Sequence, residues 1–310
     1  MAVSTLPRHS APARPASRRR TPVSNRLRRN LTGHGFLIGA VLCFIVFSWD
    51  PMVREFIMAF QRTRRGTTTW VGFANFDRIV NDPVFWQAWR NTIYFTVLAL
   101  ILGFAVPFFV ALLLNELRHA KAYLRILVYL PVMLPPVASV LLFKYFYDPG
   151  YGLFNAILKT LHLPTSLWLN SAGTAMPSVV IAATWMNMGS ATLIYLAALQ
   201  SIPGDLYEAA ELDGASLWRR VWHVTIPQTR LILSLMFLLQ VVATMQVFIE
   251  PLILAGGAGV EDSATSVVYL MYQHAFRQND LGGAAALGVM LLVVLAGFSA
   301  LYTRLAPRQD

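Results

Sequence analysis

Long apolar stretches without charged residues alternate with shorter polar segments along most of the chain. Six stretches approach the roughly 20 residues that an α-helix, rising about 1.5 Å per residue, needs to cross a bilayer. They are residues 33–49, 92–114, 126–143, 175–199, 231–249 and 282–302, and we expect the first to continue past Asp50-Pro51 towards residue 60. The pattern predicts an all-α membrane protein with six transmembrane helices.

Several of these stretches contain prolines, among them Pro107 in the second and Pro131, Pro135 and Pro136 in the third. Inside a bundle, neighbouring helices and local water satisfy the carbonyl groups that a proline leaves unpaired. The prolines therefore do not disqualify the spans, and we expect kinks at Pro107 and at Pro135-Pro136.

Composition supports the membrane interpretation. Of the 310 residues, 56% are hydrophobic and 13% are charged, whereas soluble domains carry roughly 25% charged residues. The single cysteine, Cys43, excludes an intramolecular disulfide and a cysteine-rich metal site. Because Cys43 lies in an apolar run, it is predicted to be a small buried side chain.

The net charge of +10 is concentrated in a basic tail, residues 1–30, that contains no aromatic residue. This arrangement is typical of a cytoplasmic topology anchor that also attracts lipid headgroups, rather than of a nucleic-acid-binding arm or a cleaved secretory signal. We expect the tail to be disordered. The loop charges then favour both termini inside (N-in/C-in), although Arg62, Arg64 and Arg65 fall on the outer side.

The polar loop at residues 201–227, between the fourth and fifth spans, has an interpretable local pattern. Pro203 and Asp205 suit the start of a helix, where a negative charge complements the dipole. Gly214 suits a left-handed turn at its end. Ser216 is then placed to cap a second short helix. The pattern predicts two short helices joined at a glycine corner, the first presenting small alanines flanked by acids.

The motif Glu208-Ala209-Ala210, then three residues, Gly214-Ala215, and Ile226-Pro227 at the next span resembles the EAA loop of ABC importer permeases. In that family the loop docks on the ATP-binding subunit and follows its closure. The resemblance implies the type I ABC importer permease fold, with 31–310 as the permease domain. It also implies that the ATPase-coupling residues are Glu208, Ala209, Ala210, Asp213 and Gly214.

The resemblance covers nearly the whole chain from residue 31. It is to the carbohydrate-uptake branch, and within it to the first of two unlike permeases, the maltose and glycerol-phosphate type. The segments that carry it are Gly72-Phe73-Ala74-Asn75-Phe76, residues 82–86, Asn91-Thr92, Phe248, Glu250-Pro251, Gly256-Gly257 and residues 272–276, with departures at Ala255 and Ala258-Gly259. The implied partners are a second unlike permease, two ATP-binding subunits, an extracytoplasmic solute-binding protein and membrane lipid.

None of the three lysines follows a glycine, so the sequence contains no Walker A loop. No HExxH, GxSxG or zinc-ligand spacing occurs either. We therefore expect no catalytic residue, no metal and no cofactor of this chain's own, with ATP bound by a partner subunit.

Polar residues in the fourth and fifth spans are candidates for a substrate pathway: Asn187, Ser190, Gln240, Thr244 and Val247, with Gln246 and Glu250 nearby. In the maltose-type relative a sugar site lies between the corresponding helices. The alternative role is interhelical hydrogen bonding. Likewise, Asp50 and Arg54 are expected to form a structural pair.

The sequence predicts the permease of a sugar importer. Alternatives are an importer for another solute, such as a glycerol phosphodiester or an amino acid, an integral membrane enzyme, or a passive channel. The uncharged second span and the missing motifs count against an enzyme, and a channel would need no coupling loop.

Overall fold

The computed structural model describes residues 35, 37–64, 66–116 and 121–305, and the expected tail at 1–30 lies outside this part. The chain divides into two compact units, Met1–Arg54 and Glu55–Asp310. A 22-residue helix, Leu37–Met58, runs through the boundary and includes a π-helical turn η1 (Ile45–Trp49) and α2 (Asp50–Met58). The expected continuation past Pro51 is confirmed.

The first unit contains the predicted Asp50–Arg54 pair, joined Nε to Oδ2 at 2.7 Å. No residue in the most apolar window of this helix is buried. Cys43 is exposed, so the prediction of a buried cysteine is wrong. An apolar run in a membrane segment also suits contact with lipid or another chain, and burial does not follow from it.

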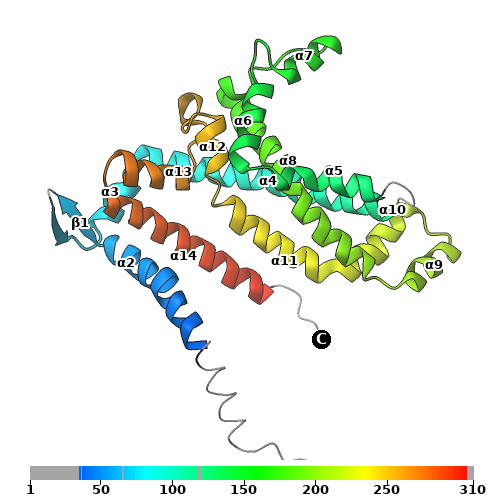
Figure 1. The fold of residues 1–310 in the computed structure, drawn as a ribbon, viewed down its shortest axis with the longest axis horizontal. Coiled ribbons are helices and arrows are strands. Elements are labelled where there is room, and N and C mark those ends of the chain that lie inside the picture. The colour runs from blue at the N-terminus through cyan, green and yellow to red at the C-terminus, as the bar shows by residue number, and fades with distance from the viewer. Residues whose placement is uncertain (1–34, 36, 65, 117–120, 306–310) are drawn as a thin grey trace, which may run out of the picture. The chain divides into compact units, whose positions relative to one another are not determined.

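Seven helices form most of the described part of the second unit. They are α4 (Pro83–Glu116), α5 (Lys121–Met133), α6 (Pro136–Phe146), α8 (Ala172–Gln200), α11 (Ile226–Thr244), α12 (Ile249–Leu254) and α14 (Leu281–Leu305). Helix α8 packs along α4 and α5, and α11 packs against α4 (Figure 1). Within the described residues, five helices are long and apolar enough to cross a membrane, and there are six such spans if the bent pair α5–α6 counts as one.

The two expected proline kinks differ. The axes of α5 and α6 are bent by 99° at the break before Pro136, because Pro135 takes an extended conformation there (φ −55°, ψ 129°). Pro107 stays inside the unbroken helix α4. The third span is therefore two half-helices rather than one.

Short elements occupy the ends of the second unit. They are β1 (Gln61–Arg64), β2 (Thr67–Trp70), α3 (Ala74–Val80), α7 (Leu153–Thr160), η2 (Trp168–Asn170), η4 (Val260–Asp262), α13 (Val267–Tyr272) and η5 (Gln273–Arg277). The strands form an antiparallel hairpin with Gln61 opposite Trp70. Helix α7 and the turn η2 lie in the segment between α6 and α8.

Arg62, whose charge conflicted with the expected orientation, lies in this hairpin rather than in a loop, and its guanidinium approaches Asn75 Oδ1 at 3.5 Å. Asn75 is fully buried and donates from Nδ2 to the carbonyls of Ala59 (2.9 Å) and Gln61 (2.8 Å). The arginine therefore belongs to a folded segment outside the spans.

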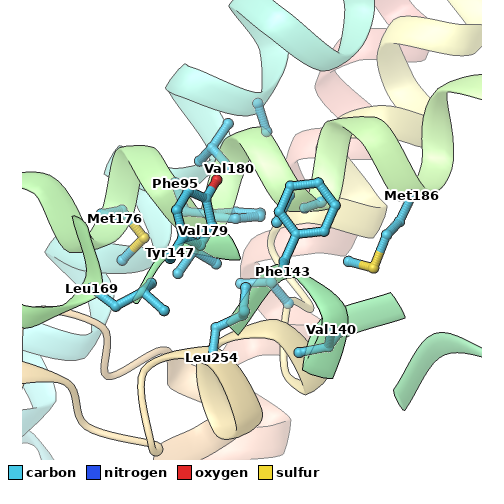
Figure 2. Close-up of a cluster of buried hydrophobic side chains, with 14 residues drawn as sticks. Phe95, Val140, Phe143, Tyr147, Leu169, Met176, Val179, Val180, Met186 and Leu254 are labelled. Carbon is cyan, nitrogen blue, oxygen red and sulfur yellow. The ribbon is translucent and has the colours of Figure 1, made fainter. Parts of the chain in front are cut away.

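A cluster of buried apolar side chains joins α4, α6, α8 and α12 (Figure 2). Phe95 of α4, Val140 and Phe143 of α6, and Leu254 of α12 contribute to it. Tyr147, 2% exposed, closes the cluster and donates its hydroxyl to the carbonyl of Ser178 at 2.8 Å. This core holds together helices α4, α8 and α12, which also line the cavity described below.

Candidate functional site

The loop between α8 and α11 contains α9 (Gly204–Leu212), α10 (Leu217–Arg220) and a π-helical turn η3 (Val221–Thr225). Pro203 precedes the first helical residue, and Asp205 lies in the first turn, as predicted. Figure 1 shows α9 and α10 at one end of the second unit, opposite the hairpin and α13.

Gly214 forms the predicted corner, with φ +72°. Its N–H donates to the carbonyl of Glu211 at 2.9 Å, and the N–H of Ala215 donates to that of Ala210 at 2.9 Å. These two bonds form a Schellman motif, which closes the helix and requires the left-handed conformation that glycine adopts without strain. Ser216 occupies the N-cap position of α10, but its side chain makes no capping hydrogen bond.

The residues expected to couple the chain to an ATPase lie on an open helix. Helix α9 has no buried residue. Glu208, Ala209, Asp213 and Gly214 are exposed and Ala210 is half-buried. Leu212 is 90% exposed, so this helix presents apolar area that is not covered by the described chain.

Contacts behind α9 hold it in place. The Tyr207 hydroxyl lies 3.0 Å from Thr225 Oγ1, and Arg220 pairs with Glu211. Trp218 packs edge-on against Phe109 of α4, with ring centroids 6.2 Å apart. The loop is therefore attached to two long helices while its outer face stays free within the described chain.

The structure differs from the prediction after the corner. The second helix is not a separate short element, because α10, η3 and α11 form one helical run that begins at Leu217. Pro227 falls in the first turn of α11, directly after the π-helical turn. The wider π-helical turn accommodates Pro227, which has no backbone N–H to donate to the helical hydrogen-bond pattern.

A cavity of about 530 Å³ lies between α4, α8, α11 and α12. All five predicted pathway residues line it: Asn187, Ser190, Gln240, Thr244 and Val247. Gln246 and Glu250 also face it, and so do residues that sequence reasoning missed, namely Phe95, Gly103, Thr184 and Phe248. Thr184 stands one helical turn before Asn187, so the spacing argument could have found it.

The amide groups in the cavity wall donate to backbone carbonyls. Asn187 Nδ2 donates to Ala183 at 2.9 Å, and Gln246 Nε2 donates to Val242 at 2.9 Å. Gln240 Nε2 reaches across to the carbonyl of Ala99 on α4 at 3.5 Å. Gly103 allows this approach, since a Cβ there would stand 2.8 Å from Gln240 Nε2.

Residues 103–310 match the family model described as binding-protein-dependent transport system inner membrane component. The chain is 31% identical over 257 residues to the arabinooligosaccharides transport system permease protein AraP of Halalkalibacterium halodurans, covering 82% of this chain and 81% of AraP. It is also 31% identical over 270 residues to the trehalose/maltose transport system permease protein MalF of Thermococcus litoralis, covering 86% of this chain and 90% of MalF.

The fold is similar to that of a chain in a bacterial ABC transporter involved in the import of the acidic polysaccharide alginate. The two superpose with a TM-score of 0.80 at 24% sequence identity, covering 93% of this chain and 100% of that one. At this identity the match establishes the fold, which is the expected type I importer permease architecture.

Proposed function

Because this chain belongs to the family of binding-protein-dependent transport system inner membrane components, we propose that it carries a sugar or sugar-like solute across the cell membrane. Family membership makes it a membrane-bound transport subunit and not an enzyme. The sugar assignment rests on the two relatives named for oligosaccharide and disaccharide transport.

The proposed assembly contains this chain, a second unlike permease, two ATP-binding subunits and an extracytoplasmic solute-binding protein. The ATP-binding subunits hydrolyse ATP, and this chain binds no cofactor of its own. Docking of the loaded binding protein on one side and closure of the ATPase on the other would alternate access to the cavity lined by Asn187 and Gln240.

The observation that carries this proposal is the exposed face of α9, where small Ala209 stands beside acidic Glu208 and the 90%-exposed Leu212 follows one turn later. Small side chains let another backbone approach closely, and an exposed leucine offers apolar area to bury. The Schellman corner at Gly214 fixes the direction in which this face points. These features fit a rigid projection that inserts into a groove of a soluble partner.

The test is Ala209→Trp in the assembled transporter. Ala209 is exposed, so the larger side chain is tolerated by the fold but obstructs docking. We expect loss of uptake and of ATP hydrolysis stimulated by the binding protein, with normal amounts of the chain in the membrane. Thr303→Trp, an equally bulky change at an exposed position in the last turn of α14, is the matched control. Wild-type uptake by Ala209→Trp would refute the coupling role.

A further inference from the structure

The cavity lining contains an acidic side chain and no basic one among its described residues. Among its described lining residues, Glu250 is the one ionisable side chain, and no lysine, arginine or histidine accompanies it. Glu250 lies in the first turn of α12, directly after the break that follows α11. An anionic solute in this cavity would meet a carboxylate and no compensating cation among the described lining residues.

The uncharged polar groups share this bias. A backbone carbonyl can only accept a hydrogen bond, so the side-chain atom that faces it must be the amide nitrogen. Asn187, Gln240 and Gln246 each direct that nitrogen to a backbone carbonyl. Their amide oxygens have no hydrogen-bond donor within the described part of the chain.

Thr244 adds to the same imbalance, because its hydroxyl proton is donated to the carbonyl of Gln240 at 2.8 Å. The oxygen of that hydroxyl keeps its capacity to accept. Each of the three amide nitrogens keeps a second N–H, and the hydroxyls of Thr184 and Ser190 can also donate. The three amide oxygens, the three hydroxyl oxygens and the two oxygens of Glu250 still give the wall more acceptors than free donors. Hydroxyl groups of a sugar are the matching donors, whereas a carboxylate, phosphate or sulfonate brings acceptors only.

We infer that this cavity selects uncharged, hydroxyl-rich solutes against anionic ones, with Glu250 as the residue that sets the selectivity. The inference rests on the proposed function, since it requires the cavity to hold the solute. Its physical reason is desolvation: moving an anion from water into a membrane cavity is unfavourable unless an opposite charge or hydrogen-bond donors compensate for the lost hydration.

The experiment measures binding to the complete transporter in detergent without its binding protein, so that the binding protein does not choose the ligand. Saturation-transfer NMR reports the weak affinities expected. The probes are arabinotriose, which is neutral, and trigalacturonate, which is anionic and of similar size. We expect the neutral trisaccharide to bind at least about tenfold more tightly, a difference equivalent to about 1.4 kcal/mol.

Three variants test the role of Glu250. Glu250→Gln is nearly isosteric and should narrow the ratio of the two affinities. Gln246→Lys should also narrow it, by supplying a cation while leaving Glu250 in place. Glu261→Gln makes the same chemical change at an exposed position outside the cavity and should leave the ratio unchanged.

Equal binding of the two trisaccharides by the wild type overturns the inference, and so does a ratio that Glu250→Gln and Gln246→Lys leave unaltered. The inference is also overturned if neither trisaccharide binds to the transporter. The proposed function is tested separately, by comparing solute uptake by Ala209→Trp with uptake by its control Thr303→Trp.

Discussion

Asp280 lies outside the spans. Among the described carboxylates there, it has the most contacts with basic side chains and hydrogen-bond donors. Its Oδ2 lies 2.6 Å from the Arg78 guanidinium and 3.0 Å from Nδ1 of His274, and its Oδ1 accepts from the N–H of Gly283 at 3.1 Å. Burial alone raises the pKa of Asp280, but these hydrogen bonds and the positive charge of Arg78 lower it well below its ordinary value. The contacts tie α3 to the start of α14.

A group whose pKa is lowered in the folded state stabilises that state above its unfolded pKa, about 3.9 for aspartate, and loses this effect as the pH falls through the folded value. Asp280→Asn should therefore lower the thermal unfolding midpoint by a constant amount between about pH 5 and 8, and the gap to the wild type should narrow progressively as the pH falls below about 4. Unfolding scans of the purified protein across this range provide the measurement.

Asp77→Asn is the control, because Asp77 is exposed on α3 and forms no ion pair within the described residues. Its midpoint should follow the wild type at every pH. A gap between Asp280→Asn and the wild type that persists unchanged at low pH would show that the loss comes from packing and not from the charge.

At the scale of elements, the crossing of α5 and α8 depends on Gly189. A Cβ at this position would stand 2.6 Å from the backbone carbonyl oxygen of Val128 and 3.0 Å from the Cα of Tyr129. These are main-chain atoms, so the helices themselves would have to separate. Close approach over a small residue is typical of helix pairs in membranes.

Gly189→Ala should destabilise the folded chain by about 1–3 kcal/mol, as overpacking in a tight core does. Gly297→Ala is the matched control, since Gly297 also lies inside a span and has no atom within 4 Å of its Cβ position. Thermal unfolding in detergent should show a lower midpoint for Gly189→Ala and no loss for Gly297→Ala. Equal midpoints for the two variants would contradict the close-packing argument.

Elements whose signal is local were predictable, and those set by distant contacts were not. The spans, the Pro135-Pro136 bend and the Gly214 corner follow from hydrophobic length, proline and glycine. The hairpin at residues 61–70 was missed because contacts outside the strands support it: Asn75 bonds to its backbone, and Phe60 stacks on Trp70 at 5.7 Å between ring centroids. Its local signals were Gly66, which has φ +83°, and the β-branched and aromatic run at residues 67–70.

The candidate site divides in the same way. Residues Asn187, Gln240 and Thr244 could be assigned because helical spacing within one span places them on a common face. Gly103 could not, since its contribution depends on how α4 is aligned with α11. Spacing within one helix contains no information about that alignment.

At the scale of the whole molecule, the N-in/C-in arrangement predicts that the loop at Ser216 faces the cytoplasm and that the end of α7 at Thr160 faces the outside. Cys43 is the only cysteine, so Cys43→Ser gives a background for single-cysteine labelling. Ser216 and Thr160 are exposed at the loop and at the end of α7. In intact cells, a membrane-impermeant maleimide should label Thr160→Cys and not Ser216→Cys, and inverted membrane vesicles should give the reverse.

Labelling of Ser216→Cys in intact cells would mean that the loop faces outward, which is incompatible with an ATPase acting on it. The unlabelled Cys43→Ser background controls for reaction at other groups.

The uninterrupted helical run from Leu217 to Thr244 has a mechanical consequence. At about 1.5 Å per residue it is a stiff rod of roughly 40 Å, with the loop at one end and Gln240 and Thr244 near the other. A tilt at the loop end would be transmitted along this helical run, through the π-helical turn η3 beside Pro227, to the part of the cavity wall that Gln240 and Thr244 form. The run ends at the irregular backbone of Met245–Phe248, and we expect a change in the tilt of α11 relative to α12 to be absorbed at this break.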